Sequence, residues 1–340
     1  MRMSLLLLAG VLGLACPGGT LKAQEPDFTF LRPWFTVTRH ERDTLSRRGV
    51  VVRALPAEGR QIAVIATCAI DLSPDGFIAR VGSAWEIERK DSAAGRFADP
   101  PVIGDLARLS LDQSDIDRLR SCRTGDCRLN LGNHEISAVR SALTRSGGEA
   151  SRDIQQTFRT LVLDRASRYW TGGLAALPEY DDRSEPVRPA DIFSEMLKQS
   201  PYLESQLPTV AAYLRQFPAG NVTPSASFLQ WSKVMMNGKA VVRVSHIGVF
   251  RRAPGPHLPA VVVAGKQVYA SRYMNGELTL TMLFAGSDGS TNYLVHVDRS
   301  ELDELGGAFS GLKRSLIEGR IKEEAIGALT ALRDRLERSR

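Results

Sequence analysis

The sequence predicts an α+β protein in which an antiparallel sheet grips a long C-terminal helix and carries a mostly helical insertion. Three observations predict this class. Four β-rich runs lie between residues 240 and 299, an amphipathic helical run follows from about residue 307 to 339, and the middle third of the chain has helical periodicity. Because short turns join the consecutive strands, the four runs are expected to form an antiparallel meander.

The region before the insertion is expected to contain two strands and a helix. Residues 50–55 are rich in β-branched side chains, and residues 62–72 form a nearly continuous apolar run that is typical of a strand covered on both faces. Ser73, Pro74 and Asp75 then supply an N-cap, a proline at the first helical position and an acid in the first turn. A helix is therefore expected to begin there.

The insertion is expected to span residues 133–217, within a helix-grip-like domain of residues 49–340 that follows a lead segment of residues 24–48. A helix over residues 151–170 has apolar side chains at helical spacing, and the glycine pair at 172 and 173 ends it. Shorter helices follow a loop that is rich in charge and proline.

The first residues are typical of a cleavable secretory signal. A charged start precedes the apolar run 5–15, and Ala23 offers a cleavage site, so residues 1–23 are predicted to be removed. The run is shorter than the ~20 apolar residues that a bilayer span needs, and no transmembrane span is expected. We therefore expect a periplasmic or secreted protein. Lipidation at Cys16 is an alternative, although Gly13 stands where a lipobox has leucine.

Composition and charge argue against a nucleic-acid surface. The chain has 43% hydrophobic and 24% charged residues, close to the averages of globular proteins. Its formal net charge is +6, but the basic residues are scattered along the chain. A nucleic-acid surface requires a basic stripe with interleaved aromatic side chains, so no nucleic-acid partner is expected.

Three cysteines remain once the predicted signal is removed. Cys122 and Cys127 are expected to form a disulfide, because Gly125 and Asp126 let the chain turn back between them. Cys68 lies in an apolar run and is expected to pack as a small buried hydrophobe. A zinc site would need a second pair of ligands, so no metal or other cofactor is expected.

The run 63–77 resembles the first strand and first helix of START-like, helix-grip proteins, the superfamily that includes Bet v 1. The tail, in which antiparallel strands lead into one long helix, is similar to the way those domains end. The chain departs from the family in the insertion of residues 133–217 and in an additional N-terminal strand. Residues 266–273, with 231–233 before them, also resemble an exported bacterial family of unknown function.

The helix-grip resemblance implies an apolar cavity between the sheet and the terminal helix. Members of that superfamily hold sterols, phospholipids, polyketides or hydrophobic hormones there, with a few polar anchors. The expected function is therefore non-catalytic binding or transport of a hydrophobic, lipid-like ligand in the bacterial cell envelope. Peripheral contact with a membrane is left open.

Five side chains are predicted to face this cavity. Strand alternation places His246 on an apolar face with its neighbours, and it places Gln267 and Tyr269 on one face of the next strand. The full set of candidates is Trp231, His246, Gln267, Tyr269 and Tyr273. A simpler alternative is that His246 and Tyr269 hydrogen-bond to one another or to the backbone within a filled core.

Two other functions stay open, although no complete catalytic motif occurs. A cavity hydrolase or cyclase could use His246 with Tyr269 or Tyr273 as acid and base, because imidazole titrates near neutral pH. An envelope scaffold or partner-binding protein could use the helical insertion. No catalytic residue is assigned from the sequence.

Overall fold

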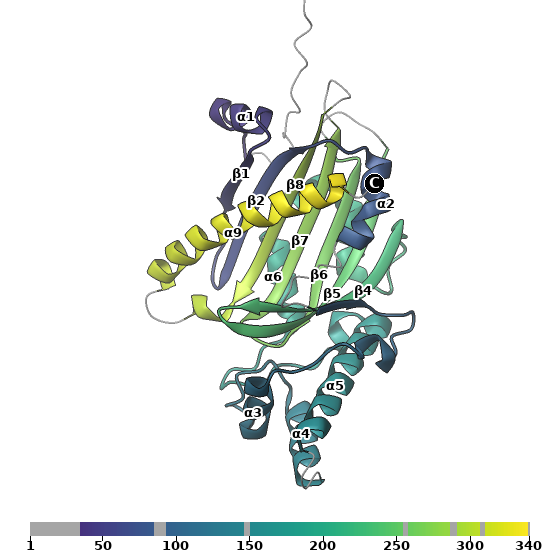
Figure 1. Cartoon of the computed structure of the whole chain (residues 1–340), viewed down its shortest axis with the longest axis vertical. Coiled ribbons are helices and arrows are strands. Elements are labelled where there is room, and N and C mark those ends of the chain that lie inside the picture. Colours follow the sequence, from purple (N-terminus) through teal and green to yellow (C-terminus); the bar gives the residue numbers. More distant parts are fainter. Residues whose placement is uncertain are drawn as a thin grey trace, which may run out of the picture.

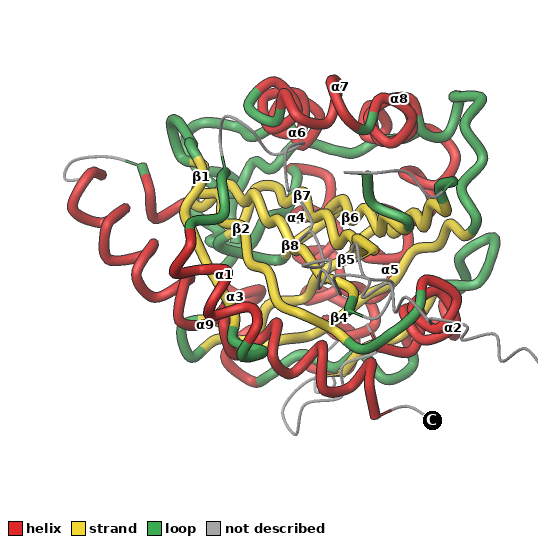
Figure 2. The backbone as a smooth tube through the Cα atoms, turned by 90° about the horizontal axis from the view of Figure 1, so that it is seen from above, coloured by secondary structure: helices red, strands yellow, loops and turns green. Residues whose placement is uncertain are grey.

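The computed structural model describes residues 35–84, 93–145, 150–253, 258–285, 291–306 and 310–338. One sheet lies between two layers of helices, and a further group of helices lies beyond one end of the sheet (Figure 1, Figure 2). The predicted signal peptide, its cleavage site at Ala23 and the alternative lipidation site at Cys16 lie outside the described residues.

The sheet has eight strands in the order β1-β2-β8-β7-β6-β5-β4-β3, and every neighbouring pair is antiparallel. The strands are β1 (Val50–Leu55), β2 (Gln61–Ile70), β3 (Ala93–Arg96), β4 (Ala226–Met236), β5 (Lys239–Arg251), β6 (Val261–Ala270), β7 (Met274–Ala285) and β8 (Asn292–Leu302). The expected meander is confirmed, and β4 extends it by one strand that the sequence pattern had not predicted. Strand β2 is buried along its whole length, as its continuous apolar run predicted.

Helices lie on both faces of this sheet and also beyond one end of its strands (Figure 1). They are α1 (Arg39–Ser46), α2 (Pro74–Ala84), α3 (Gln113–Ser121), α4 (Asn133–Arg145), α5 (Ala150–Gly172), α6 (Pro189–Lys198), α7 (Pro201–Gln206), α8 (Pro208–Gln216) and α9 (Ser310–Arg338). Short 3-10 turns occupy Ile103–Leu106, Leu174–Ala176 and Asp303–Leu305. Helix α2 begins where the capping pattern predicted, and the Ser73 hydroxyl accepts a hydrogen bond from the Gly76 N–H at 3.1 Å.

We call the sheet face that α2 and α9 cover the α9 face, and the opposite one the insertion face. Helices α5 to α8 cover the insertion face, and Figure 2 shows the two helical layers on either side of the sheet. The α+β class, with an antiparallel sheet, a long C-terminal helix across it and a helical insertion, is therefore as the sequence predicted.

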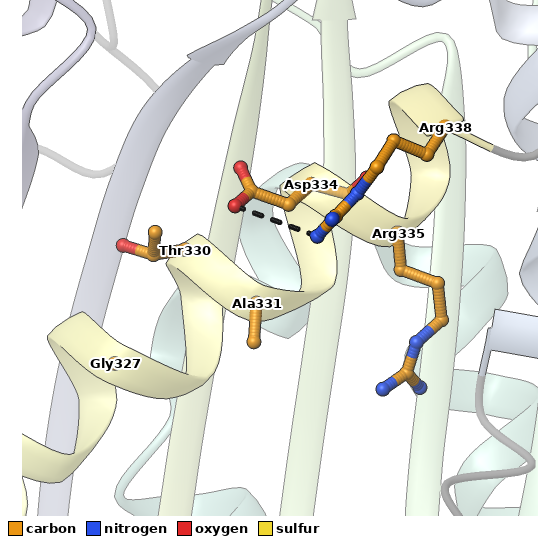
Figure 3. Close-up of a pocket in the computed structure, with 6 residues that line it drawn as sticks. All are labelled: Gly327, Thr330, Ala331, Asp334, Arg335 and Arg338. Atoms are coloured by element: carbon orange, nitrogen blue, oxygen red, sulfur yellow. Dashed lines mark hydrogen bonds and ion pairs between the residues drawn. The ribbon is translucent and has the colours of Figure 1, made fainter.

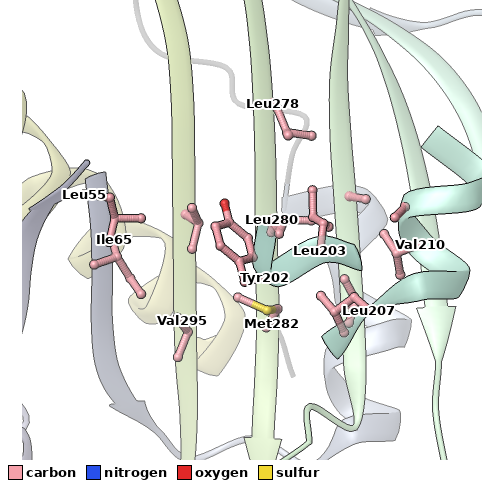
Figure 4. Packing of buried hydrophobic residues seen from close by; sticks show 14 of the residues in the cluster. Leu55, Ile65, Tyr202, Leu203, Leu207, Val210, Leu278, Leu280, Met282 and Val295 are labelled. Carbon is pink, nitrogen blue, oxygen red and sulfur yellow. The ribbon is translucent and has the colours of Figure 1, made fainter. Parts of the chain in front are cut away.

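The insertion face is filled by interlocking side chains (Figure 4). Leu203, Leu207 and Val210 come from α7, α8 and the turn between them. They pack against Leu280 and Met282 of β7, and none of these five residues is more than 1% exposed. This face is therefore closely packed in the way that protein interiors normally are.

Helix α9 is held at both ends. Near its start, the Arg314 guanidinium donates to the carbonyl oxygens of Gln61 at 2.6 Å and Gly59 at 2.7 Å. Near its end, Leu336 is fully buried, and its carbonyl accepts a hydrogen bond from Arg80 at 2.6 Å. The middle of the helix therefore bridges the sheet between two fixed points (Figure 1).

The cysteines behave as the sequence predicted. Cys122 and Cys127 form a disulfide, and Cys68 is a buried free thiol. Burial raises the pKa of the Cys68 thiol to about 12, so this side chain packs as a neutral, inert hydrophobe.

Candidate ligand-binding cavity

A cavity of about 420 Å³ lies between the middle of α9 and the sheet. This volume falls within the range of ~300–1,000 Å³ that is usual for small-molecule sites. The sheet contributes the apolar side chains of Ile62, Val64, Met236, Met274 and Leu302, and α9 contributes Ile321, Ala325, Ala328, Leu329 and Leu332. The hollow expected from the helix-grip resemblance is therefore present beneath the terminal helix.

The floor of the cavity is polar. Arg243 of β5 forms an ion pair with Glu277 of β7, and their side chains are 21% and 10% exposed. On β8, the Ser300 hydroxyl donates to Asp298 at 2.6 Å. His296 Nδ1 lies 2.9 Å from the Thr281 hydroxyl. The floor therefore combines one guanidinium, two carboxyl groups and an imidazole under an apolar roof.

Strand register brings these groups to one face. Glu277 pairs with Ser300, and Thr281 pairs with His296, across the β7–β8 ladder. Residues that pair across an antiparallel ladder point to the same side of the sheet, as do residues two apart on one strand. Asp298 therefore lies between His296 and Ser300 in the same row, facing α9.

Burial shifts the titration of these groups away from their charged forms. Burial raises the pKa of Glu277, although the Arg243 guanidinium opposes that shift. Burial likewise raises the pKa of Asp298, against the hydrogen bond from Ser300 and the charge of Arg243. Burial lowers the pKa of His296, so its imidazole is neutral near pH 7.

The predicted cavity residue His246 lies on the insertion face instead. Its Nδ1 is 2.7 Å from the Tyr169 hydroxyl, and its Nε2 is 2.9 Å from the Tyr213 hydroxyl and 3.0 Å from the Ser227 hydroxyl. His246 is 1% exposed, and the Phe217 ring packs against it at 4.2 Å between centroids. The expectation of a filled core is thus met at this residue, but with partners other than Tyr269.

Trp231 and Tyr269 share that face with His246. Each is 1% exposed. The Trp231 indole N–H donates a hydrogen bond to the Asp105 carbonyl at 2.9 Å. The Arg165 guanidinium lies over the Tyr269 ring, 4.9 Å from the ring centroid. Both side chains therefore belong to the core beneath the insertion, away from the cavity under α9.

A β-bulge separates Gln267 from Tyr269, which alternation had placed together. Val244 pairs with Tyr269 and Ser245 pairs with Gln267, so β6 has one extra residue at this point. Gln267 consequently lies on the α9 face, where its Oε1 has no hydrogen-bond partner among the described residues. Tyr273 packs beside the cluster that contains Met274, near the cavity but outside its lining.

The binding roles of the five predicted residues stay predictions, and the polar floor had not been predicted from the sequence. The signal was present in two stretches where polar residues alternate with apolar ones, 277–281 and 295–298. We had expected the more apolar face of the strands to line the cavity. In the structure, that apolar face is buried under the insertion instead.

Two other depressions are less suited to a ligand. One, of about 640 Å³, lies on the outer side of α9 and is lined by residues of that helix alone (Figure 3). Another, of about 680 Å³, lies among the ends of α5, α6 and α8. The first lacks a second wall, and neither contains a group of polar side chains beneath an apolar roof.

Comparisons with known proteins identify no family. No family model matches the chain, and neither does any curated protein. A solved structure of the Zhui aromatase/cyclase from Streptomyces sp. R1128 is 16% identical and covers 39% of this chain and 82% of its own, with a TM-score of 0.26. Ara h 8.0201 is 11% identical and covers 44% of this chain and 90% of its own, with a TM-score of 0.21.

The described residues contain neither a membrane-spanning helix nor a metal-binding cluster. None of the helices in this part of the chain combines the length and apolar character that crossing a membrane requires. Likewise, the described side chains include no group of three or more His, Cys, Asp or Glu residues placed to hold a metal ion.

Proposed function

We propose that this protein binds a hydrophobic small molecule or lipid in the cavity beneath α9, without catalysing a reaction on it. The observation that supports the proposal is the cavity itself, with a volume of about 420 Å³, apolar walls and a polar floor. Functional pockets commonly have this composition, because apolar walls provide affinity and a few polar groups fix the orientation of the ligand.

The way α9 is held also supports a binding role. Ile321, Ala325 and Ala328 face a hollow in the middle of the helix, while Arg314 and Leu336 fix its two ends. Covering this apolar wall with a ligand would contribute about 25 cal/mol per Å² of area removed from water. A bound molecule would therefore stabilise the helix against the sheet.

The cell envelope is the proposed location. The disulfide between Cys122 and Cys127 is typical of an oxidising compartment, and the predicted signal peptide would deliver the chain there. A carrier or reservoir for an envelope lipid is the role that these features favour.

Binding can be tested with N-phenylnaphthylamine, a neutral dye whose fluorescence rises in apolar surroundings. We expect saturable binding of one dye molecule per chain. Ala325→Trp, which places an indole inside the cavity, is expected to weaken binding at least about ten-fold by occupying the space.

Ala331→Trp is the matched control. Ala331 lies on the outer side of α9 (Figure 3), so the same substitution there should leave dye binding unchanged. Thermal melting of both variants checks that they are folded. An equal loss of dye affinity in both variants would contradict binding in this cavity. So would dye binding that neither substitution changes.

A further inference from the structure

The charges that line the cavity are unevenly matched. Among the described lining residues the charged groups are one cation, Arg243, and three carboxylates, Glu277, Asp298 and Glu324. Glu277 already neutralises Arg243 in their ion pair. Glu324, on the rim, contacts Arg320 at 3.3 Å. The cavity therefore has no cation left over for an anionic ligand.

Asp298 is the carboxylate with the least compensation inside the cavity. It accepts a hydrogen bond from the Ser300 hydroxyl at 2.6 Å, and no ion pair is recorded for it among the described residues. The neighbouring imidazole of His296 adds no positive charge, since burial lowers its pKa. Burial raises the pKa of Asp298, and a cation bound in the hollow would favour its ionised form. Asp298 thus offers acceptor oxygens to whatever occupies the hollow.

The head group of a ligand would contact the Asp298 oxygens in a buried site, where the effective dielectric constant is low. A second carboxylate placed beside Asp298 would be a like charge with no counter-ion, which is costly to bury. A protonated amine would instead form charge-assisted hydrogen bonds, which are about twice as strong as neutral ones. A hydroxyl would donate one neutral bond and should fall between the two.

We propose that the cavity selects apolar molecules that end in a protonated amine, and that it discriminates against molecules that end in a carboxylate, as fatty acids do. This inference rests on the proposed function and narrows its ligand class. Asp298 would bind the head group of the ligand, while the apolar side chains of the sheet and α9 would pack against its apolar tail.

Three probes with the same tail test the inference: decylamine, decanol and decanoate. Their binding to the full folded protein is measured at pH 7 by calorimetry, below their micelle concentrations. We expect decylamine to bind about ten-fold more tightly than decanol, because one charge-assisted hydrogen bond replaces a neutral one. Decanoate is expected to bind more weakly than decanol.

Asp298→Asn is the decisive variant, because it removes the charge and keeps the shape. It should reduce decylamine affinity about ten-fold and leave decanol affinity within about two-fold. Glu323→Gln is the matched control. Glu323 is an exposed neighbour of the rim residue Glu324 that does not line the cavity, so its loss should leave the preference for decylamine intact.

The outcomes separate the two proposals. If decanol binds while decylamine and decanoate bind equally, or if decanoate binds best, the amine inference is overturned and the binding function stands. A preference for decylamine that survives Asp298→Asn also overturns it. If none of the three probes binds, the proposed function itself has failed.

Discussion

The two faces of the sheet bury polar groups in different ways. On the insertion face, several helices pack against the strands, and the polar groups there are enclosed: Arg165 is 1% exposed and is held by two hydrogen bonds to Glu135. On the α9 face, one helix bridges a row of polar side chains and leaves about 420 Å³ unfilled. The contrast indicates that one face stabilises the fold and the other is available to a ligand.

The difference follows from how much structure covers each face. Four helices of the insertion supply enough apolar side chains to fill their side to normal density. The middle of α9 supplies Ile321, Ala325, Ala328, Leu329 and Leu332 above the polar floor, and the two small alanines among them leave part of that space unfilled. A hollow therefore results where a single helix, held at its ends, passes over the sheet.

The largest expected effect is on the insertion face, at the buried ion pair. Glu135→Leu leaves the Arg165 guanidinium buried without a carboxylate, and we expect the free energy of unfolding to fall by about 3–5 kcal/mol. Combining Glu135→Leu with Arg165→Met should restore most of that loss, because no charge is then buried. Denaturant titration measures both variants, and a double variant as unstable as the single one would contradict this account.

Truncation of apolar side chains compares the two faces directly. Leu203→Ala removes a fully buried side chain from the insertion face and is expected to cost about 2–5 kcal/mol. Ile321→Ala borders space that is already empty, so it should cost less than ~1 kcal/mol. Chemical denaturation of the two variants is the measurement. Similar losses would mean that the cavity is filled in solution.

The effect of pH on stability should come from the insertion face as well. Lys266 is 1% exposed, and burial lowers the pKa of its amine from 10.5 to about 7. Between these two values the unfolded chain binds a proton that the folded chain does not, so the free energy of unfolding should rise with pH by ~1.4 kcal/mol per unit. Below about pH 7 both states are protonated, and this contribution to the slope disappears.

Lys266→Met isolates that contribution. The methionine keeps the length of the side chain and removes the titrating amine, so the rise in stability between pH 7 and pH 10.5 should be lost. Unfolding titrations at several pH values provide the comparison with the unsubstituted protein. An unchanged slope in the variant would show that other groups carry the pH dependence.

The sequence was sufficient for the architecture but not for every strand. Turns between apolar runs predicted the meander, and amphipathic spacing predicted the long terminal helix, because both signals are local. Strand β4 was missed because Ser227, Gln230, Ser232 and Lys233 interrupt its apolar content. Its pairing with β5 along eleven positions is a tertiary contact that no local pattern records.

The site was harder to predict because it depends on which helices cover each face of the sheet. Alternation correctly grouped His246 with apolar neighbours, but the insertion covers that face and α9 does not. The bulge between Gln267 and Tyr269 reverses the alternation within β6, and nothing in the local sequence marks it. The polar row at Glu277 and Asp298 was visible as a pattern, but the polar anchors had been expected elsewhere, at His246, Gln267 and Tyr269.

Methyl NMR of an isoleucine-labelled sample tests the central claim most directly. Ile62 and Ile321 line the cavity, whereas Ile65 is fully buried on the insertion face and Ile154 is fully buried among the insertion helices. On addition of N-phenylnaphthylamine, the ring currents of the bound dye should shift the methyl signals of Ile62 and Ile321 and leave those of Ile65 and Ile154 in place. Shifts confined to Ile65 and Ile154 would place the ligand away from the cavity beneath α9 and contradict the account.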